Sequence, residues 1–350
     1  MNAAFAAFLA LAEQDRRDVI ESAAGRLDTL PTYVEKDLWV CVVLDAIFNG
    51  LPNGHPRLLF KGGTSLSKVF GLIDRFSEDI DLVVYRHDLG FGGDRDPTAA
   101  GDLSNKQRAE LFKTLTNECS SYVLGDLRTA VADAIGEVSE GCRIVPDTDD
   151  PQSLLVEYPT LYPASDTAYV APSVKIEAGA RSAIDPNQSS GVTAFIDDEL
   201  NDASLDVANV RVLSPQRTYW EKLLILHGAH CGYRDKERVP EDRNRISRHY
   251  YDAAMITATE TGASALSDLD LLDAVRSHNI VAFRQAWKRF EQATPGSVRL
   301  VPQPGLREAI ERDYAAMQSM ILGDVPEFEW INERLREAET AINHSSRPSA

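Results

Sequence analysis

Positive charge is scarce in this chain. Its 350 residues include 36 lysines and arginines against 54 aspartates and glutamates, which gives a formal net charge of -18. A surface of that average charge repels nucleic acids and anionic membranes except where basic residues gather locally. Long apolar runs are also absent, because no stretch reaches the roughly 18 residues that indicate a transmembrane helix. We therefore expect no membrane-spanning segment.

Cysteine is rare and scattered. Cys41, Cys119, Cys142 and Cys231 lie far apart and form no Cys-x-x-Cys pair, which predicts reduced thiols rather than a disulfide framework or a zinc site. The short apolar stretch 3–10 has no preceding lysine or arginine and runs on into charged residues, unlike a signal peptide. These absences together predict a cytoplasmic protein.

Composition and pattern predict two domains. Hydrophobic residues make up 43% of the chain, enough for a full core. Strand and helix patterns mix over residues 1–205, and helical patterns dominate over 206–350. We predict a core domain with N-terminal helices over 1–205 and a helical C-terminal domain over 206–350. Helices are expected over 3–25, 31–48, 65–72 and 103–138 and from Ser214-Pro215 onward, strands over 58–60, 80–84, 142–145, 154–158, 174–178 and 210–213, and irregular chain over 87–102 and 183–209.

Two aspartates at alternating positions carry the sharpest functional signal. In a strand, Asp79 and Asp81 point to one face, while Ile80 and Leu82 point to the other. Neighbouring carboxylates repel each other, so a fold places them together mainly to hold a cation. The alternative is a polar strand edge that faces solvent. We predict that Asp79 and Asp81 bind a divalent metal.

A glycine turn precedes this acid pair. Gly62 and Gly63 end an apolar strand and open a predicted helix, a geometry that exposes backbone N–H groups to a phosphate. The hydroxyls of Thr64 and Ser65 are further donors, and Lys68 either adds charge or is simply solvated. A glycine pair alone often serves only the backbone. Followed by the acid pair, it predicts nucleotidyl transfer from a nucleoside triphosphate.

Glu177 offers a third carboxylate. It shares one face of the strand 174–178 with Lys175, opposite the apolar residues. A third acid completes an oxygen shell for one or two Mg²⁺ ions. The alternative is a surface ion pair between Lys175 and Glu177.

Two charged residues lie in apolar helical surroundings of the C-terminal domain. Lys222 either extends past its neighbours into solvent or faces the triphosphate as a point charge. Asp252 is either a general base or a structural partner of Arg248. His227, in the same helix as Lys222, is expected to be structural.

The segment Arg234 to His249 gathers six lysines and arginines in an otherwise acidic chain. Four acids are interleaved, so a solvated loop is one interpretation. A local basic segment is also where an RNA backbone docks on an acidic protein. We retain both.

These segments together resemble the nucleotidyltransferase toxins of the AbiEii/AbiGii family, the MenT-like toxins of type IV toxin–antitoxin systems. The resemblance spans roughly residues 30–260 and four motifs in order: Glu35-Lys36-Asp37, then Phe60 to Lys68 with Arg75 to Leu82, Thr218 to Leu223, and Arg248 to Asp252. Segments 87–170 and 183–209 fit the pattern poorly, and we expect them to influence the choice of RNA or nucleotide.

The resemblance implies an α+β fold, with a DNA polymerase β-like core, a mixed sheet and a mainly helical C-terminal part. It implies that Asp79 and Asp81 hold Mg²⁺, that Gly63 and Ser65 hold the triphosphate, and that Lys222 and Asp252 complete the site. It further implies a cognate AbiEi-like antitoxin of winged-helix type, phosphorylation of the serine at position 77, and tRNA 3′ ends as acceptors.

Three functions are therefore weighed. The first is transfer of a nucleotide from a nucleoside triphosphate to an RNA 3′-hydroxyl. The second is nucleotide or phosphoryl transfer to a protein hydroxyl. The third is a non-catalytic binding partner whose acidic surface sequesters a basic protein.

Overall fold

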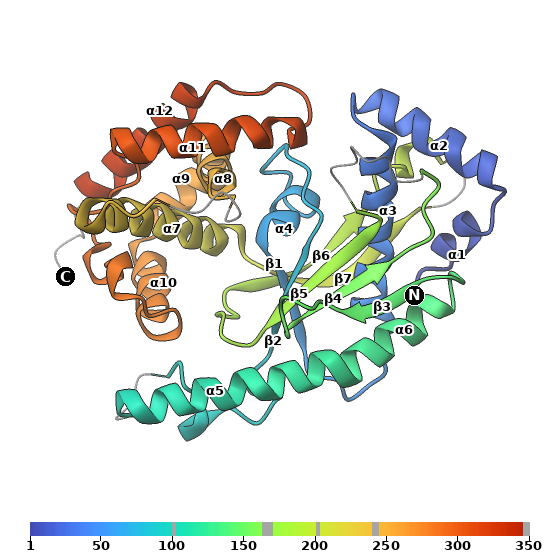
Figure 1. Ribbon diagram of the computed structural model, residues 1–350, viewed down its shortest axis with the longest axis horizontal. Coiled ribbons are helices and arrows are strands. Elements are labelled where there is room, and N and C mark those ends of the chain that lie inside the picture. The colour runs from blue at the N-terminus through green and yellow to red at the C-terminus, as the bar shows by residue number, and fades with distance from the viewer. Residues whose placement is uncertain (100–102, 163–170, 201–203, 240–244, 346–350) are drawn as a thin grey trace. The chain divides into compact units, whose positions relative to one another are not determined.

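The computed structural model describes the chain except for residues 100–102, 163–170, 201–203, 240–244 and 346–350 (Figure 1). It forms two compact units. Unit 1 consists of Met1–Val69 and Phe76–Leu213, and unit 2 of Phe70–Arg75 and Ser214–Ala350. The sequence placed the division at 205/206. In the structure, residues 206–213 form a strand of the unit 1 sheet, and six residues from the N-terminal half join unit 2.

Unit 1 is built on a seven-stranded sheet with the order β3-β4-β5-β2-β1-β7-β6. The strands are β1 (Leu58–Lys61), β2 (Ile80–Val84), β3 (Arg143–Pro146), β4 (Ser153–Glu157), β5 (Ser173–Gly179), β6 (Asn187–Thr193) and β7 (Asp206–Leu213). The central strand β2 pairs antiparallel with β1 and parallel with β5, and β1 pairs parallel with β7. The sheet is therefore mixed and the fold is α+β, as predicted.

One strand lies where the sequence predicted irregular chain. β6 is polar, and Val192 is its single buried residue. It pairs antiparallel with β7 at the end of the sheet order. Because its pairing rests on backbone hydrogen bonds to β7 rather than on an alternating apolar face, hydrophobic periodicity gave no sign of it.

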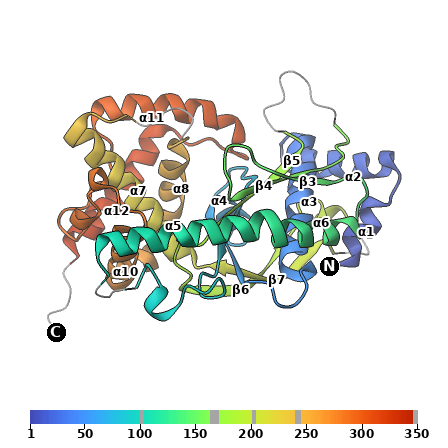
Figure 2. The same ribbon diagram turned by 60° about the horizontal axis from the view of Figure 1, so that its bottom comes forward.

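The helices of unit 1 follow the predicted segments with three differences. They are α1 (Ala3–Leu9), α2 (Glu13–Arg26), α3 (Pro31–Asp45), α4 (Gly62–Lys68), α5 (Asn105–Tyr122) and α6 (Arg128–Gly136). The helix expected over 65–72 begins and ends earlier, at Gly62–Lys68. The segment expected as one helix over 3–25 is two helices, because the backbone is extended at Ala12. The segment 103–138 is α5 and α6 joined by a π-helical turn at Val123–Leu127, and Figure 2 shows them as one continuous rod.

Three consecutive charged residues of α3 are buried, and two of them anchor segments near the acid pair. Lys36 donates to the carboxylate of Glu78, the residue before Asp79. Asp37 forms an ion pair of 2.6 Å with Lys68 at the end of α4. Lys68 is thus a buried structural cation, and neither of the roles expected for it from sequence applies.

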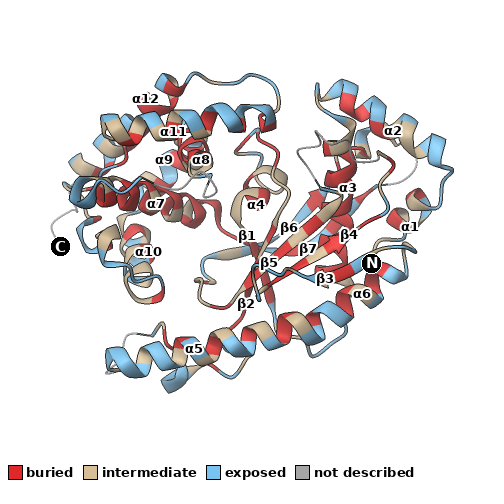
Figure 3. Cartoon of the chain, viewed as in Figure 1, coloured by how far each residue is buried: buried red, intermediate tan, exposed pale blue. Residues whose placement is uncertain are grey.

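Unit 2 is helical. Its helices are α7 (Pro215–Lys236), α8 (Ser247–Thr257), α9 (Glu260–Ser267), α10 (Leu269–Ala282), α11 (Pro304–Met317) and α12 (Phe328–His344). α8 contacts α7, α9, α11 and α12 and is largely buried, as is α7 (Figure 3). α7 begins as predicted, because the Ser214 hydroxyl accepts the N–H of Arg217 and Pro215 occupies the first turn.

None of the helices in the described part of the chain is long and apolar enough to cross a membrane.

His227 is a buried histidine of α7 with both ring nitrogens engaged. Its Nδ1 accepts the N–H of Arg299 at 3.1 Å, and its Nε2 lies 3.3 Å from the carbonyl oxygen of Arg289. This pattern fits a neutral ring protonated at Nε2. Burial lowers the pKa of His227 to about 4.

We predict that His227 makes unit 2 acid-sensitive. Because its pKa in the folded chain lies below the value of 6.5 for a free histidine, its contribution to stability is complete above pH 6.5 and is lost as the pH falls toward 4. The free energy of unfolding should drop by roughly 2 kcal/mol from this group between pH 7 and pH 5. Urea denaturation at both pH values measures it.

The variant His227→Gln keeps a donor and an acceptor without titrating. It should show a smaller difference between pH 7 and pH 5 than the parent chain, whereas His344→Gln, at an exposed position on α12, should leave that difference unchanged. Equal pH dependence in the parent and His227→Gln would contradict this account.

Candidate active site

The turn between β1 and α4 brings the backbone of Gly62 against the carboxylate of Asp81. Gly62 has a φ of +82°, which L side chains rarely adopt. A Cβ atom built on it would lie 1.8 Å from Oδ2 and 2.6 Å from Cγ of Asp81. Glycine is therefore required twice at this position, for its backbone conformation and for the space that Asp81 occupies.

Asp81 lies beside two other charged residues on one face of the sheet. In register it faces Lys61 of β1 on one side and Glu177 of β5 on the other. Cross-strand partners point to the same face, so these three side chains leave the sheet side by side. The structure thus places Glu177 beside Asp81.

The carboxylate of Glu177 is engaged by its own strand. Lys175 Nζ lies 2.8 Å from Glu177 and 3.1 Å from Asp147. The Lys175–Glu177 ion pair, the alternative from sequence, is therefore present. Among the described residues, no three histidine, cysteine or acidic side chains gather as a ready metal site. A role for Glu177 as a metal ligand stays a prediction and requires it to leave Lys175.

Thr64 ties the turn to the segment of the acid pair. Its hydroxyl lies 2.5 Å from the carbonyl oxygen of Asp79 and 2.9 Å from the hydroxyl of Ser77. The Ser65 hydroxyl donates to the carbonyl oxygen of Gly62 at 2.9 Å. The Thr64 proton is thus used on the acid-pair segment, and the Ser65 proton is used within the turn. Its remaining donors are backbone N–H groups of the first turn of α4, which have no acceptor within the helix.

In unit 2, the fully buried Asp252 is bound by two cations. Arg75 grips it with two parallel hydrogen bonds, Nε to Oδ1 at 2.7 Å and Nη2 to Oδ2 at 2.8 Å. Lys222 Nζ donates to Oδ2 at 2.7 Å. The structure therefore brings Lys222 and Asp252 together, as predicted. The partners of Asp252 are Arg75 and Lys222 rather than Arg248, the partner considered from sequence.

The protonation of this cluster follows from burial and charge. Burial opposes ionisation of Asp252, but Arg75 and Lys222 hold its pKa well below the usual range. Burial lowers the pKa of Lys222, with Arg75 acting in the same direction and Asp252 opposing it. Both oxygens of Asp252 accept hydrogen bonds from cations. A carboxylate so stabilised is a poor proton acceptor, and Asp252 is better described as a positioning residue than as a general base.

Arg75 was not singled out from sequence. It was noted only as the first residue of the motif that runs to the acid pair, and Arg-x-x-x-Asp spacing alone does not reveal a partner more than 170 residues away. The sequence did contain one indication: Asp252 is a charged residue in an apolar helix, and a buried carboxylate needs a cation from another part of the chain.

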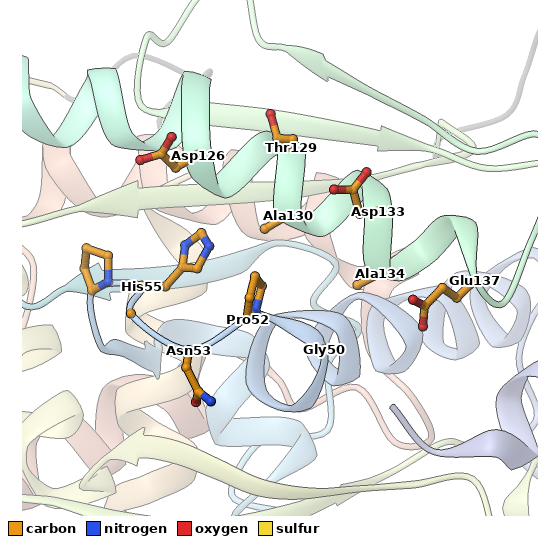
Figure 4. Close-up of a pocket in the computed structure, with 12 residues that line it drawn as sticks. Gly50, Pro52, Asn53, His55, Asp126, Thr129, Ala130, Asp133, Ala134 and Glu137 are labelled. Atoms are coloured by element: carbon orange, nitrogen blue, oxygen red, sulfur yellow. The ribbon is translucent and has the colours of Figure 1, made fainter.

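A separate pocket of about 650 Å³ lies in unit 1 and contains none of the predicted site residues. Figure 4 shows Asp126, Asp133 and Glu137 on one wall and His55 on the facing loop. Three carboxylates would repel a triphosphate. This pocket is therefore not a candidate for the nucleotide site.

The glycine turn beside a carboxylate and the mixed sheet are compatible with the nucleotidyltransferase expected from sequence. A family model described as "Nucleotidyl transferase AbiEii toxin, Type IV TA system" matches residues 45–334. The chain belongs to this family of nucleotidyltransferase toxins. This confirms the predicted family and the prediction of an enzyme, and type IV toxin–antitoxin systems imply an antitoxin partner.

A solved structure supports the fold. MenT4, a nucleotidyltransferase toxin from Mycobacterium tuberculosis H37Rv, superposes with a TM-score of 0.51 at 16% sequence identity, over 96% of this chain and 91% of its own. At that identity the likeness concerns the fold alone. No curated protein matches in sequence.

We predict that Arg75 stabilises unit 2 through Asp252. Arg75→Met leaves the buried carboxylate with Lys222 alone and should lower the free energy of unfolding by about 3 kcal/mol. Arg75→Lys keeps the charge but loses the paired hydrogen bonds and should cost less, about 1 to 2 kcal/mol. Urea denaturation measures both, and equal effects of the two substitutions would contradict the bidentate role.

Proposed function

We propose that this enzyme transfers a nucleotide from a nucleoside triphosphate to an RNA 3′-hydroxyl, with the tRNA 3′ end as acceptor, and that Asp79 and Asp81 hold Mg²⁺ for the reaction. The observation that carries the proposal is the carboxylate of Asp81 lying against Gly62, whose missing Cβ leaves it that space. This closeness supports Asp81 as a metal ligand beside the turn that presents backbone N–H groups.

The donor set fits the metal. Aspartate oxygens are the ligands that Mg²⁺ prefers, and nucleoside triphosphates bring further oxygens of their own. When bound, Mg²⁺ would lower the pKa of the attacking hydroxyl and neutralise charge on the triphosphate. Glu177, beside Asp81 in register, is the third ligand proposed.

The residues of the chain position the two substrates and neutralise the charge of the triphosphate. The first-turn N–H groups at Gly62 and Gly63 bind the triphosphate, with the buried hydroxyls of Thr64 and Ser65 holding the turn in shape. The 3′-oxygen of the RNA forms a bond to the α-phosphorus, the bond to the bridging oxygen breaks, and pyrophosphate leaves. The proton of the hydroxyl passes to water, because Asp252 is unsuited to accept it.

Lys222 supplies positive charge to the triphosphate in this proposal. It is held by Asp252, which is in turn held by Arg75. The segment Thr218 to Leu223, which resembles a recurring motif of this family, supports assigning Lys222 to the reaction.

Ser77 and the antitoxin belong to regulation. The Ser77 hydroxyl contacts Thr64, whose own hydroxyl holds the carbonyl oxygen of Asp79. A phosphate on Ser77 would add negative charge beside the acid pair and weaken triphosphate binding. We propose such a modification, and a cognate AbiEi-like antitoxin, as the means of control in a cytoplasmic system.

A rival reaction on the same residues is nucleotide or phosphoryl transfer to a protein hydroxyl. Parallel reactions with α-labelled and γ-labelled triphosphates, with tRNA present or absent, separate the two. Label from the α position on RNA supports the proposal, and label from the γ position on protein would overturn it. The third function weighed, a non-catalytic binding partner, is set aside because the family consists of nucleotidyltransferases.

We predict that Asp81→Ala lowers nucleotide incorporation into tRNA at least about a hundredfold, because the metal loses a ligand where charge develops. Incorporation of α-labelled nucleotide with excess Mg²⁺ measures it, beside a melting curve that should stay near that of the parent. Asp198→Ala, at an exposed acid of the same unit, is the matched control. Undiminished incorporation by Asp81→Ala would remove the acid pair from the mechanism.

A further inference from the structure

A tryptophan in unit 2 packs against α7 at a position where α7 has two glycines. Trp287 and Lys288 lie in a short 3-10 turn, Ala286–Lys288. A Cβ on Gly232 would lie 2.8 Å from Cε3 of Trp287, and one on Gly228 would lie 3.1 Å from Cγ of Lys288. Because the two glycines are one helical turn apart, the missing side chains form a flat place on α7 for this turn.

Two like charges share the indole of Trp287. The guanidinium of Arg238 lies 4.4 Å from the ring centroid, and the ammonium of Lys288 lies 5.5 Å from it. Neither forms an ion pair with a carboxylate of the described residues. Burial lowers the pKa of Lys288, and the charge of Arg238 adds to that effect.

The excess of positive charge continues along the same turn. Arg289 follows Lys288, and it shares the carboxylate of Asp235 with Arg234, at 2.9 Å and 2.7 Å. Arg289 also approaches Glu291 at 3.9 Å. The four cations named here (Arg234, Arg238, Lys288, Arg289) therefore meet two carboxylates among the described residues, in a chain whose net charge is -18.

Unneutralised cations that repel each other are a cost unless an anion joins them. Acids outnumber bases in this chain, so a structural need for neutrality could have been met by a carboxylate. A phosphate between Arg238 and Lys288 relieves their repulsion, and the half-buried indole beside it supplies an aromatic ring for contact with a base. Phosphate and base together are the repeating chemistry of single-stranded nucleic acid.

We propose that Trp287, Arg238 and Lys288, called the Trp287 patch below, bind the sugar–phosphate backbone and one base of the RNA acceptor. The inference rests on the proposed function, since it assigns a docking surface to that RNA. It extends the basic segment 234–249 noted in the sequence, which contains Arg238, by Trp287 and Lys288, 38 and 39 positions after His249. Residues 240–244 of that segment lie outside the described part of the chain.

The test measures binding of a fluorescein-labelled tRNA by anisotropy with the full chain. Trp287→Ala should weaken binding about tenfold, from loss of stacking. The double substitution Arg238→Gln and Lys288→Gln should weaken binding and reduce the steepness of log K against log salt by about 0.7, the contribution of the one single-strand phosphate that the two cations share in this proposal.

The chain offers a matched control in the same unit. Trp330 on α12 is half-buried and carries Arg334 over its ring, but Arg334 has an ion pair with Glu337. Trp330→Ala, and the double substitution Arg334→Gln and Arg336→Gln, remove an aromatic ring and equal charge. They should leave tRNA affinity and its salt dependence unchanged.

Failure of this inference and failure of the proposed function give different results. The Trp287 patch variants should raise KM for tRNA and keep kcat at saturating tRNA, whereas Asp81→Ala loses kcat. If the parent chain labels tRNA but the patch variants bind tRNA as tightly as the parent, the patch is wrong and the function stands. If the parent binds tRNA through the patch but transfers no nucleotide to it, the function fails and the surface stands.

A protein partner is the competing occupant. If the patch variants lose binding to purified antitoxin while their tRNA affinity stays at the parent value, the patch is a protein interface and the inference is overturned. Should Trp287→Ala melt early, because Trp287 packs on Gly232, the double charge variant decides the question by its salt dependence alone.

Discussion

The space left empty by Gly62 is the constraint on which the site depends. The carboxylate of Asp81 fills the volume that any side chain at position 62 would need, and the left-handed backbone there suits glycine alone. The turn and the acid must therefore be built together. Neither the proposed phosphate-binding turn nor the proposed metal ligand is specified by its own segment alone. The turn at Gly62 has room for no side chain because of Asp81, and the carboxylate of Asp81 has its place because Gly62 lacks a Cβ atom.

Seven residues, Arg75 to Asp81, are anchored by contacts that are each local to one unit. Arg75 is held by Asp252 in unit 2, while in unit 1 Glu78 is held by Lys36 and the carbonyl of Asp79 by Thr64. Buried ion pairs contribute little net stability but are costly to break. Their use at Arg75 and Glu78, shortly before the acid pair, favours a role in fixing the local backbone over a role in raising stability.

Local pattern predicted the elements whose signal is local. β2 begins and ends at the predicted residues, Ile80 and Val84, because its apolar face alternates cleanly, and α7 starts at Ser214-Pro215 because capping is a matter of a few residues. The missed features depend on distant partners. β6 pairs with β7 through its backbone, and Lys68 is buried in an ion pair with Asp37, a residue thirty-one positions earlier.

The same limit applies to the candidate site. Acids at alternating positions and a charged residue in an apolar helix are visible in one segment, so Asp79, Asp81, Lys222 and Asp252 could be named from sequence. The paired hydrogen bonds between Arg75 and Asp252 could not be predicted, since they join segments far apart in the chain. These bonds change the role expected of Asp252, from a candidate base to a residue that positions a cation.

The pairing of positive with negative side chains bears on how the enzyme binds its substrates. The chain is strongly acidic, and some of its buried cations are matched one to one with carboxylates, as in the Lys36–Glu78 and Lys68–Asp37 pairs. Two clusters differ from these pairs. Arg75 and Lys222 meet one carboxylate, and Arg238 and Lys288 meet none among the described residues. An enzyme that joins a triphosphate to a polyanion needs positive charge for each substrate, and a surplus at two separate clusters is what that requirement predicts.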